Sequence, residues 1–488
     1  MKILLVQPPT EHMILGNNPE IIDEERGYNP PLGILYIAGH LEKYTDHEVE
    51  ILDCLVEELS YPQVEERIRQ SAPDVVGITC LTFTLLDVIE VVRIVKELNP
   101  ETWVVVGGPH AHIYGRETAS LKGVDFVVTG EGEETMTELV KALDQGETEP
   151  GVSGLIYFRD GHMTNTGKRE PVEDLDGLPF PARHLTKYEK YTSLLARGTA
   201  VTTMFTSRGC PYGCKYCDRP NMGRSFRFRT PENVADEFEQ CAEMGIDEFL
   251  IYDDTFSVSK KRALEICQEI IRRDLKVYWD IRTRVDLVNE ELLVALRESG
   301  CVRIHYGVEA ASDAILKNLN RGVKVKRIQE TFELTKKVGI GTLGYFMIGN
   351  PGETSEDVER TIQFAEELDP DFAHITILTP FPATQIYFDA LKRGMYENDH
   401  WADFARNPHP EFRPRFWEEN LTPDELRDLC EKAYRRFYGR PKFMFKRLTQ
   451  IRSFGELFRN MRAGYKLLTT KMGRMGTGVP HPLEPVSA

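Results

Sequence analysis

The sequence predicts an α/β protein with two successive parallel-sheet domains and a mainly helical C-terminal region. Strand-like apolar runs alternate with amphipathic helical patterns over residues 1–145 and again over residues 196–385. A stretch rich in Gly and Pro, residues 146–195, separates the two regions, and the alternation ends before residues 386–488. Such alternation is typical of parallel sheets whose faces are covered by helices.

The first region predicts five strands and four helices. The strands are expected at residues 2–7, 49–53, 74–79, 103–107 and 125–129, and the helices at 32–43, 61–70, 85–98 and 133–143. The strands are continuously apolar, which indicates burial on both faces and therefore a doubly wound sheet. Ligands bind such sheets at the carboxyl ends of the strands. In the following linker, residues 153–158 and 163–166 predict a small hairpin.

The second region repeats the alternation six times, which predicts a partial (βα)6, TIM-like barrel. Its strands are expected at residues 202–207, 248–252, 277–281, 303–308, 341–348 and 372–378, and its helices at 231–244, 260–273, 289–299, 325–338 and 355–368. Functional residues then belong at the carboxyl ends of these strands. The region after the barrel predicts a helix at 422–438, with Thr422 and Glu425 in the capping-box arrangement. Its aromatic residues either line a substrate cavity or pack beneath the barrel; these are Trp401, Phe404, Phe412, Phe416 and Trp417.

Composition excludes several classes of protein. The formal net charge of −17 disfavours general nucleic-acid binding, which needs a basic surface. No apolar run approaches the roughly 20 residues that cross a bilayer, and the N-terminus resembles a first strand, so a cytoplasmic location is expected. Nine cysteines, six of them scattered, argue against a disulfide framework. The basic, amphipathic segments 443–461 and 460–470 fit contact with a membrane surface, or a helix docked on the acidic body.

Three cysteines form the strongest motif. Cys210, Cys214 and Cys217 stand at C-x3-C-x2-C spacing just after a predicted strand, in a loop with turn-forming Gly and Pro. Thiolates select zinc or iron–sulfur. A structural zinc site needs a fourth ligand, and the nearest downstream cysteine, Cys241, lies in a helical pattern. An iron–sulfur cluster with one open iron fits better than zinc or unliganded thiols.

This loop, with the aromatic Tyr216 before its last cysteine, resembles that of the radical S-adenosylmethionine (SAM) superfamily. The resemblance implies a [4Fe-4S] cluster on the three cysteines, whose open iron is chelated by the methionine part of SAM. An electron from the cluster then cleaves SAM to a 5′-deoxyadenosyl radical. A reducing partner such as a flavodoxin or ferredoxin is implied as well, with a small molecule as substrate.

The resemblance continues at the ends of later strands. Asp253 and Asp254 end the second strand, where relatives approach the methionine part of SAM; the alternative is a helix N-cap. Arg284 stands in a segment similar to the family's T-R-x-D pattern, whose Arg contacts SAM, although an ordinary salt bridge is also expected there. Glu309 follows Gly-Val as in the family's G-V-E-S segment, with Ala310 in place of the Ser. Gly349 belongs to a glycine-rich strand end that resembles the one lying against adenine.

A doubly wound domain ahead of such a barrel resembles the cobalamin-binding subclass of the superfamily. The loops after its strands are implied to contact cobalamin, through Thr79, Thr82, Gly107, Gly108, His110, Gly130, Glu131 and Gly132. The D-x-H-x-x-G signature, whose His ligates cobalt, is absent after the first strand, so no His of that motif ligates the metal. The alternatives are a different nucleotide-like ligand, or a domain that has lost binding.

Together these features predict a cobalamin-dependent radical SAM enzyme, foremost a methyltransferase acting at an unactivated carbon. The chain also resembles relatives of the anaerobic magnesium-protoporphyrin monomethyl ester cyclase, which form rings or oxidise with the same cofactors. A third hypothesis is a non-catalytic corrinoid carrier with a structural metal site. Arg284, Glu309 and Gly349 argue against it, because a carrier needs no residues that contact SAM.

Overall fold

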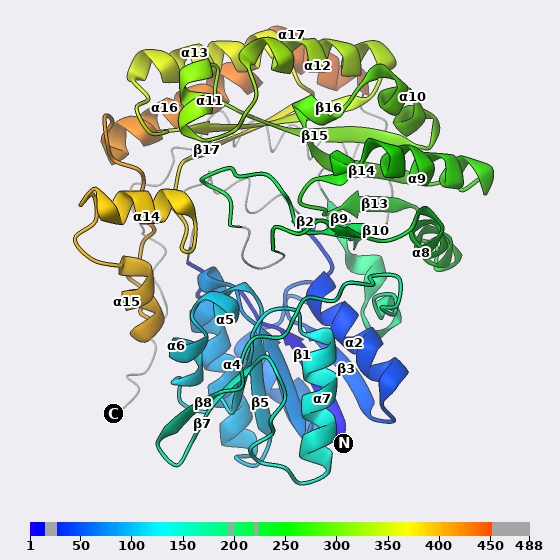
Figure 1. Ribbon diagram of the computed structural model, residues 1–488, viewed down its shortest axis with the longest axis vertical. Helices are drawn as coiled ribbons and strands as arrows, with labels where there is room; N and C mark the ends of the chain where they lie inside the picture. Colours follow the sequence, from blue (N-terminus) through cyan, green and yellow to red (C-terminus); the bar gives the residue numbers. More distant parts are fainter. Residues whose placement is uncertain (15–26, 194–195, 197–199, 219–222, 451–488) are drawn as a thin grey trace.

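The computed structural model describes residues 1–14, 27–193, 196, 200–218 and 223–450 of the chain. Two α/β domains lie one above the other along the long axis of the molecule, with α14 (Gln385–Lys392) and α15 (His400–Arg406) at their side (Figure 1). The predicted fold class is confirmed: a doubly wound parallel-sheet domain precedes a partial barrel and a helical C-terminal region.

The first domain is a seven-stranded sheet in the order β3-β1-β4-β5-β6-β7-β8. Its strands are β1 (Lys2–Gln7), β3 (Glu48–Asp53), β4 (Val75–Thr79), β5 (Trp103–Gly107), β6 (Phe126–Val128), β7 (Leu155–Arg159) and β8 (His162–Asn165). Helices α2 (Leu32–Tyr44) and α7 (Glu133–Asp144) cover one face; α3 (Tyr61–Ser71), α4 (Leu85–Leu98), α5 (Pro109–Ile113) and α6 (Gly115–Ala119) cover the other. Ile3 and Leu5 point into one layer of core and Leu4 and Val6 into the other, so both faces are buried as predicted.

The predicted hairpin is present, but it is part of the first sheet instead of a free linker element. Strand β7 pairs antiparallel with β6, and β8 pairs antiparallel with β7. The sheet therefore continues beyond residue 145, where the sequence placed the end of the domain. A short antiparallel pair, β2 (Gly27–Tyr28) with β9 (Thr192–Ser193), joins the start of the chain to the end of the linker.

The second domain is an open six-stranded parallel sheet in chain order, β10-β13-β14-β15-β16-β17. The strands are β10 (Val201–Met204), β13 (Glu248–Ile251), β14 (Tyr278–Arg284), β15 (Cys301–Glu309), β16 (Gly341–Ile348) and β17 (Phe372–Ile377). Its outer face carries α8 (Pro231–Glu243), α9 (Lys260–Arg272), α10 (Glu290–Glu298), α11 (Asp313–Asn318), α12 (Val325–Val338) and α13 (Ser355–Leu368). The other face of the sheet is turned toward the first domain (Figure 1).

The C-terminal region packs against both domains. Helix α16 (Pro423–Tyr438) begins with the predicted capping box at Thr422 and Glu425 and covers β17. The five aromatic residues singled out in the sequence are at most 6% exposed: Trp401, Phe404, Phe412, Phe416 and Trp417. The Trp401 ring meets the Phe83 ring of the first domain edge to face. This packing fits the second of the two sequence-based alternatives, in which these rings form core.

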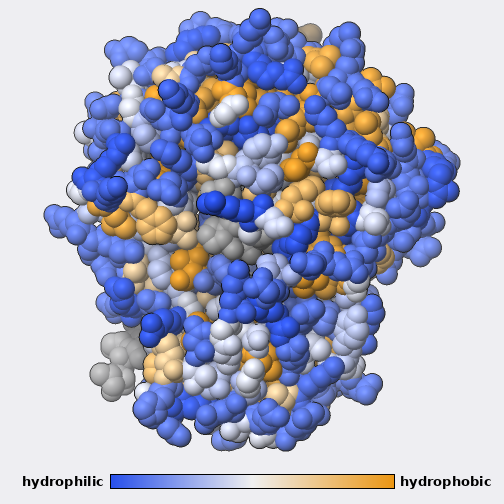
Figure 2. All heavy atoms as spheres, in the orientation of Figure 1, coloured by the Kyte–Doolittle hydropathy of each residue, from blue (hydrophilic) through white to orange (hydrophobic). Residues whose placement is uncertain are grey.

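The face of the molecule in Figure 2 is largely hydrophilic with scattered apolar areas, in keeping with an acidic chain. In the part of the chain that the structure describes, no helix has both the length and the apolar character to cross a bilayer. Helix α17 (Pro441–Gln450) begins the basic tail. Most of the segments predicted to contact a membrane surface, 443–461 and 460–470, lie outside the described residues.

Candidate active site

The three cysteines lie in a loop at the carboxyl end of the barrel, after the short strand β11 (Ser207–Arg208), which pairs with β12 (Arg227–Phe228). None of the three cysteines forms a disulfide in the described part of the chain; Cys214 is buried, Cys210 is half-buried and Cys217 is exposed. Over the described residues, no three or more His, Cys, Asp or Glu side chains are gathered in the geometry of a metal site. The donor set itself suits an iron–sulfur cluster, because three soft thiols share one short loop and two cations stand beside it.

Those cations are the guanidinium groups of Arg321 and Arg284. Their Nη1 atoms lie 3.6 Å and 3.8 Å from the Cys214 Sγ, within reach of a charge-assisted hydrogen bond to sulfur. Arg284 also stacks over the Tyr212 ring at 4.2 Å and donates two hydrogen bonds of 3.0 Å to Asp286. The ordinary salt bridge expected as the alternative is thus present, and it orients the same guanidinium that touches the cysteine loop.

Arg321 was missed by the sequence interpretation. It follows α11 in a tight turn, where Asn320 and Gly322 both have positive φ, and Asn320 donates a hydrogen bond to the Gly213 carbonyl. The Arg321 Nη2 donates a hydrogen bond of 3.0 Å to the Gly307 carbonyl. The available signal was the Asn-Arg-Gly turn itself, since Asn and Gly mark positions that adopt left-handed backbone.

Glu309 and Tyr216 meet at the end of β15. The Tyr216 hydroxyl donates a 2.8 Å hydrogen bond to Glu309 Oε1, and the Arg321 Nε lies 3.8 Å from the same oxygen. Glu309 has φ of 68°, and the register with β16 shifts there. A buried, non-glycine residue in this conformation costs about 1–3 kcal/mol, which is typical of functional positions. Burial raises the pKa of Glu309.

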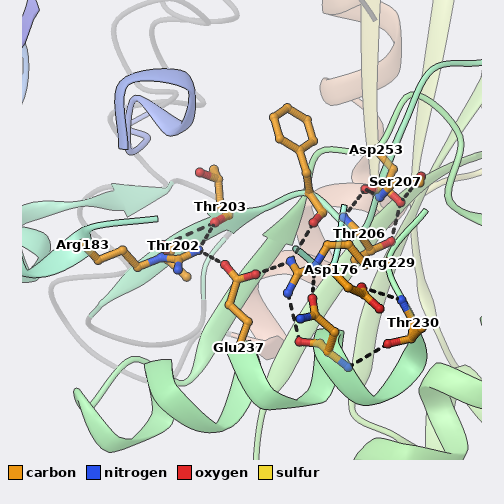
Figure 3. A network of polar contacts seen from close by, with 12 residues as sticks. Asp176, Arg183, Thr202, Thr203, Thr206, Ser207, Arg229, Thr230, Glu237 and Asp253 are labelled. Atoms are coloured by element: carbon orange, nitrogen blue, oxygen red, sulfur yellow. Dashed lines mark hydrogen bonds and ion pairs between the residues drawn. The ribbon is translucent and has the colours of Figure 1, made fainter. Parts of the chain in front are cut away.

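Asp253 has a structural set of partners. Its carboxylate accepts four hydrogen bonds, from the backbone N–H and the hydroxyl of both Thr206 and Ser207, and the residue is 1% exposed (Figure 3). It therefore fixes the chain that enters the cysteine loop. Burial and the neighbouring charge of Asp253 raise the pKa of Asp254, whose carboxyl accepts from the Gly209 backbone N–H. Neither residue forms a helix N-cap bond: Ser259 caps the next helix.

A second polar network binds the end of β10, just before the cysteine loop. The buried Glu237 of α8 accepts from Arg183 Nη2 at 2.5 Å and from Arg229, and Arg229 also donates to the Phe205 carbonyl at 2.9 Å (Figure 3). Arg183 belongs to the linker and donates to Thr202 Oγ1 at 2.8 Å. The linker, α8 and the end of β10 are thereby joined by charged side chains that are at most 4% exposed.

Gly349 differs from its expected role. It has φ of 76°, and a Cβ built there would stand 2.8 Å from Leu426 Cδ2 on α16. Glycine is required for the backbone conformation and for close packing of α16 on the strand end. This geometry explains the residue without a nucleobase, so the adenine contact stays a prediction.

Glu353, four residues later, has a pKa near neutrality. Its Oε2 accepts from the Asn350 backbone N–H at 2.8 Å, while Oε1 is buried without a hydrogen-bond partner among the described residues. Burial raises the pKa of Glu353 from 4.5 to about 7. The folded state therefore binds this proton more tightly than the unfolded state does, and stability falls as the pH rises from 4.5 toward 7.

Replacing Glu353 with Gln should remove this loss of stability at rising pH, because the amide of Gln does not ionise. We expect the variant to be about 3 kcal/mol more stable than the wild type above pH 7, because each pKa unit corresponds to about 1.4 kcal/mol. The difference should shrink to near zero below pH 4.5. Urea unfolding at a series of pH values measures it, with the exposed Glu356→Gln as control. Curves of wild type and Glu353→Gln that run parallel would contradict the assignment.

In the first domain, the predicted cobalamin-binding loops meet at the carboxyl edge of the sheet, on the side of the barrel. Thr79 pairs with Gly107 in the sheet, and the Thr82 hydroxyl lies 3.0 Å from His110 Nδ1. Burial lowers the pKa of His110 to about 4, so its ring is neutral. Gly108 has φ of 100°, and a Cβ there would stand 3.0 Å from the Cys80 carbonyl, so contacts between these loops already require glycine.

In the Gly130-Glu131-Gly132 loop, Glu131 contacts the cysteine-bearing domain. Glu131 accepts two hydrogen bonds from Arg227, of 3.0 Å and 2.7 Å, and one of 2.8 Å from the Val172 backbone N–H. Arg208 donates to Glu133 at 2.5 Å and lies 3.3 Å from Glu131. These four side chains are each less than 10% exposed. We call Arg208, Arg227, Glu131 and Glu133 the interdomain clasp.

The clasp changes the interpretation of Glu131. Its carboxylate is saturated by Arg227, Val172 and Arg208, so a direct contact with cobalamin finds no support in this geometry, whereas Gly130 has open space around it. Gly132 packs on Ile37, with 3.0 Å between the Ile37 Cδ1 and a Cβ built on the glycine. Arg208 stands two residues before Cys210, so the clasp ties the cysteine loop directly to this loop of the first domain.

Comparison with known families and proteins finds two domain matches and relatives over nearly the whole chain. Residues 204–365 match the Radical SAM superfamily and residues 21–140 match the B12 binding domain. The chain is 35% identical over 457 residues to an uncharacterized methyltransferase of Pyrococcus horikoshii, covering 93% of this chain and 96% of that protein. It is 31% identical over 479 residues to the anaerobic magnesium-protoporphyrin IX monomethyl ester cyclase of Rubrivivax gelatinosus, covering 95% of this chain and 84% of that protein.

Solved structures show the same fold at low sequence identity. The radical SAM methyltransferase TsrM from Kitasatospora setae, with tryptophan and a SAM analogue bound, superposes with a TM-score of 0.67 at 21% identity, covering 80% of this chain and 76% of that one. The cobalamin-dependent radical SAM enzyme OxsB, with aqua-cobalamin and SAM bound, gives a TM-score of 0.72 at 17% identity, covering 96% and 72%. From its full-length relatives and its two domain matches, the chain belongs to the Radical SAM superfamily, among the members that carry a B12 binding domain ahead of the radical SAM domain.

Proposed function

We propose that the protein is a cobalamin-dependent radical SAM methyltransferase that acts at an unactivated carbon of a small-molecule substrate. The observation that carries this proposal is the interdomain clasp, which fixes the loop of Cys210, Cys214 and Cys217 over the carboxyl edge of the first sheet. Among the relatives of similar length, the Pyrococcus horikoshii protein is described as a methyltransferase. When bound, the cluster, SAM and cobalamin supply the electron, the radical and the methyl carrier.

The chain's own residues hold and orient these groups. The thiols of Cys210, Cys214 and Cys217 bind the cluster, and Arg284 and Arg321 offset its negative charge beside Cys214. Glu309, held by Tyr216, presents its carboxyl at the mouth of the barrel for SAM. The loops of Thr82, His110 and Gly130 receive the cobalamin at the edge of the first sheet. We propose that a cytoplasmic flavodoxin or ferredoxin supplies the electron.

The second candidate is an oxidative cyclase of the magnesium-protoporphyrin monomethyl ester type, favoured by the 31% identity to the Rubrivivax enzyme over 95% of this chain. Anaerobic turnover separates the two. Reconstituted protein is supplied with SAM, reductant and a host-cell extract, and both 5′-deoxyadenosine and S-adenosylhomocysteine are quantified, with and without cobalamin. Methyl transfer predicts that both products rise together and that cobalamin is required.

Two other outcomes decide against methyl transfer. A rise in 5′-deoxyadenosine alone would favour the cyclase. Formation of neither product by protein with an intact cluster would contradict a radical enzyme of either kind.

A further inference from the structure

The inner face of the barrel carries a row of polar side chains to which the sequence assigns no role. Tyr252, Arg282, Tyr345 and His374 come from neighbouring strands or their ends and are each partly exposed. Their neighbours in the chain, such as Ile281 and Ile375, are buried in the core beneath the outer helices. Because side chains alternate along a strand, the four project from the face turned toward the first domain.

Register places these residues beside the cysteine loop. Tyr345 pairs with Gly307 on one side and with His374 on the other, and Gly307 pairs with Arg284, the residue that touches Cys214. Gly307 has no side chain. The space above it, between Tyr345 and Arg284, is bordered by Arg321 and Glu309. A molecule on this face would therefore lie close to the place where the radical forms.

Behind Tyr345 lies a chain of buried hydrogen bonds. The Tyr345 hydroxyl is 3.0 Å from His305 Nδ1, and His305 Nε2 is 3.0 Å from Asp280 Oδ2. Asp280 and His305 are 1% and 2% exposed. Burial opposes ionisation of Asp280, but His305 and the two arginines beside it hold its pKa below the ordinary value. Burial lowers the pKa of His305, so the ring is neutral.

These states fix the direction of the hydrogen bonds. An ionised carboxylate only accepts, so His305 Nε2 carries the proton, and Nδ1 accepts from the Tyr345 hydroxyl. In this arrangement the carboxylate orients the neutral imidazole, and the imidazole can take the proton of the hydroxyl that is hydrogen-bonded to it. Of these three hydrogen-bonded residues, Tyr345 is the one that is partly exposed on the inner face of the barrel.

Arg282 brings a positive charge to this face. Asp280 lies between two guanidinium groups, at 3.3 Å from Arg282 and 3.6 Å from Arg303. Arg282 lies 3.9 Å above the Tyr252 ring. Next to Tyr345, at 5.7 Å between ring centroids, the His374 Nε2 is buried and has no hydrogen-bond partner among the described residues. It offers a further polar contact to a ligand.

We propose that this face is a substrate subsite in which Tyr345, backed by His305 and Asp280, takes a proton from a hydroxyl group of the substrate. The substrate proton passes to the phenolic oxygen while the phenolic proton passes to His305 Nδ1, and no electron is exchanged. The resulting imidazolium is paired with Asp280, and Arg282 stabilises the alkoxide or enolate oxygen. The inference rests on the proposed function and adds its substrate class: a molecule with a hydroxyl group within reach of the reacting carbon.

The test uses 4-fluorophenol as a probe, because its ¹⁹F signal reports both binding and ionisation of its oxygen. The fully reconstituted wild-type protein should bind it and shift the signal toward that of the phenolate. Tyr345→Phe, which removes only the hydroxyl, should weaken binding about tenfold. His305→Gln keeps a hydrogen-bonding side chain but cannot take the proton, so bound probe should show the signal of the neutral phenol. Tyr278→Phe, at the exposed start of β14, is the matched control and should behave as wild type.

Two results would overturn the subsite: no binding to wild type, or equal binding to wild type and Tyr345→Phe. Iron content and the cobalamin absorbance of the same samples are measured separately. Protein that loads both cofactors but ignores the probe refutes the subsite alone. Protein that binds the probe but takes up neither cofactor refutes the proposed function and leaves the subsite standing.

Discussion

Replacing Cys214 with Ala is expected to abolish formation of 5′-deoxyadenosine. Cys214 is the buried member of the three cysteines, and two guanidinium groups lie 3.6 Å and 3.8 Å from its sulfur. Without it, two thiols remain for a cluster that needs three, and Arg284 and Arg321 each lose one of their contacts. Iron and sulfide per chain should fall to near zero after reconstitution, and no SAM should be cleaved.

A matched control separates loss of the cluster from loss of the fold. Cys241 is also fully buried, but it lies in α8 within the hydrophobic core. Cys241→Ala should lose about 1 kcal/mol of stability, as ordinary core truncations do, and keep its iron. If Cys214→Ala retained a full complement of iron and cleaved SAM, the assignment of the cysteine loop would be wrong.

Breaking the interdomain clasp should have the largest effect on stability. Glu131→Gln leaves Arg227 and Arg208 buried with less than their full counter-charge, and removing one partner of a buried ion pair costs about 3–5 kcal/mol. Both the midpoint of denaturant unfolding and the affinity for cobalamin should fall, because the clasp positions the loop after β6. Equilibrium unfolding and titration with hydroxocobalamin measure the two effects.

Glu134 provides the comparison for this variant. It lies in the first turn of α7, three residues after Glu131, and pairs with Arg169, but its side chain is 44% exposed. Solvent screens such a pair, so Glu134→Gln should change the unfolding free energy by no more than about 0.5 kcal/mol. Equal effects of Glu131→Gln and Glu134→Gln would show that the clasp contributes no more than a surface ion pair.

The fold was predictable because its signals are local. Apolar strands and amphipathic helices alternate in the sequence, and each strand predicted for the barrel is present, with shifted ends at several. The exact ends of the strands were harder to predict, since β14 continues through polar residues to Arg284 and β15 continues to Glu309. Those residues are held in the sheet by neighbours on adjacent strands, which a single segment of sequence does not reveal.

The partners of the site residues were the part that sequence could not supply. Glu131 and Asp253 stand in segments that resemble family motifs, yet their carboxylates are saturated by arginines and by backbone N–H groups from distant segments. The roles of Arg321 and of the hydrogen-bonded residues Asp280, His305 and Tyr345 were not predicted, because their proximity arises only when strands far apart in the sequence are placed in register. Spacing identifies ligands on one loop, as it did for the three cysteines, but not pairs made by packing.

The bond between Arg183 and Glu237 has a consequence for the order in which the chain is synthesised. The two residues are 54 positions apart, and both are buried in the finished protein. While the nascent chain is shorter than α8, the guanidinium of Arg183 has no acid to neutralise it. In a fragment that ends at residue 195, Arg183 therefore stays hydrated by water and the linker lacks the ion pair that holds it to α8. The linker is expected to take up its final position only after α8 has been synthesised.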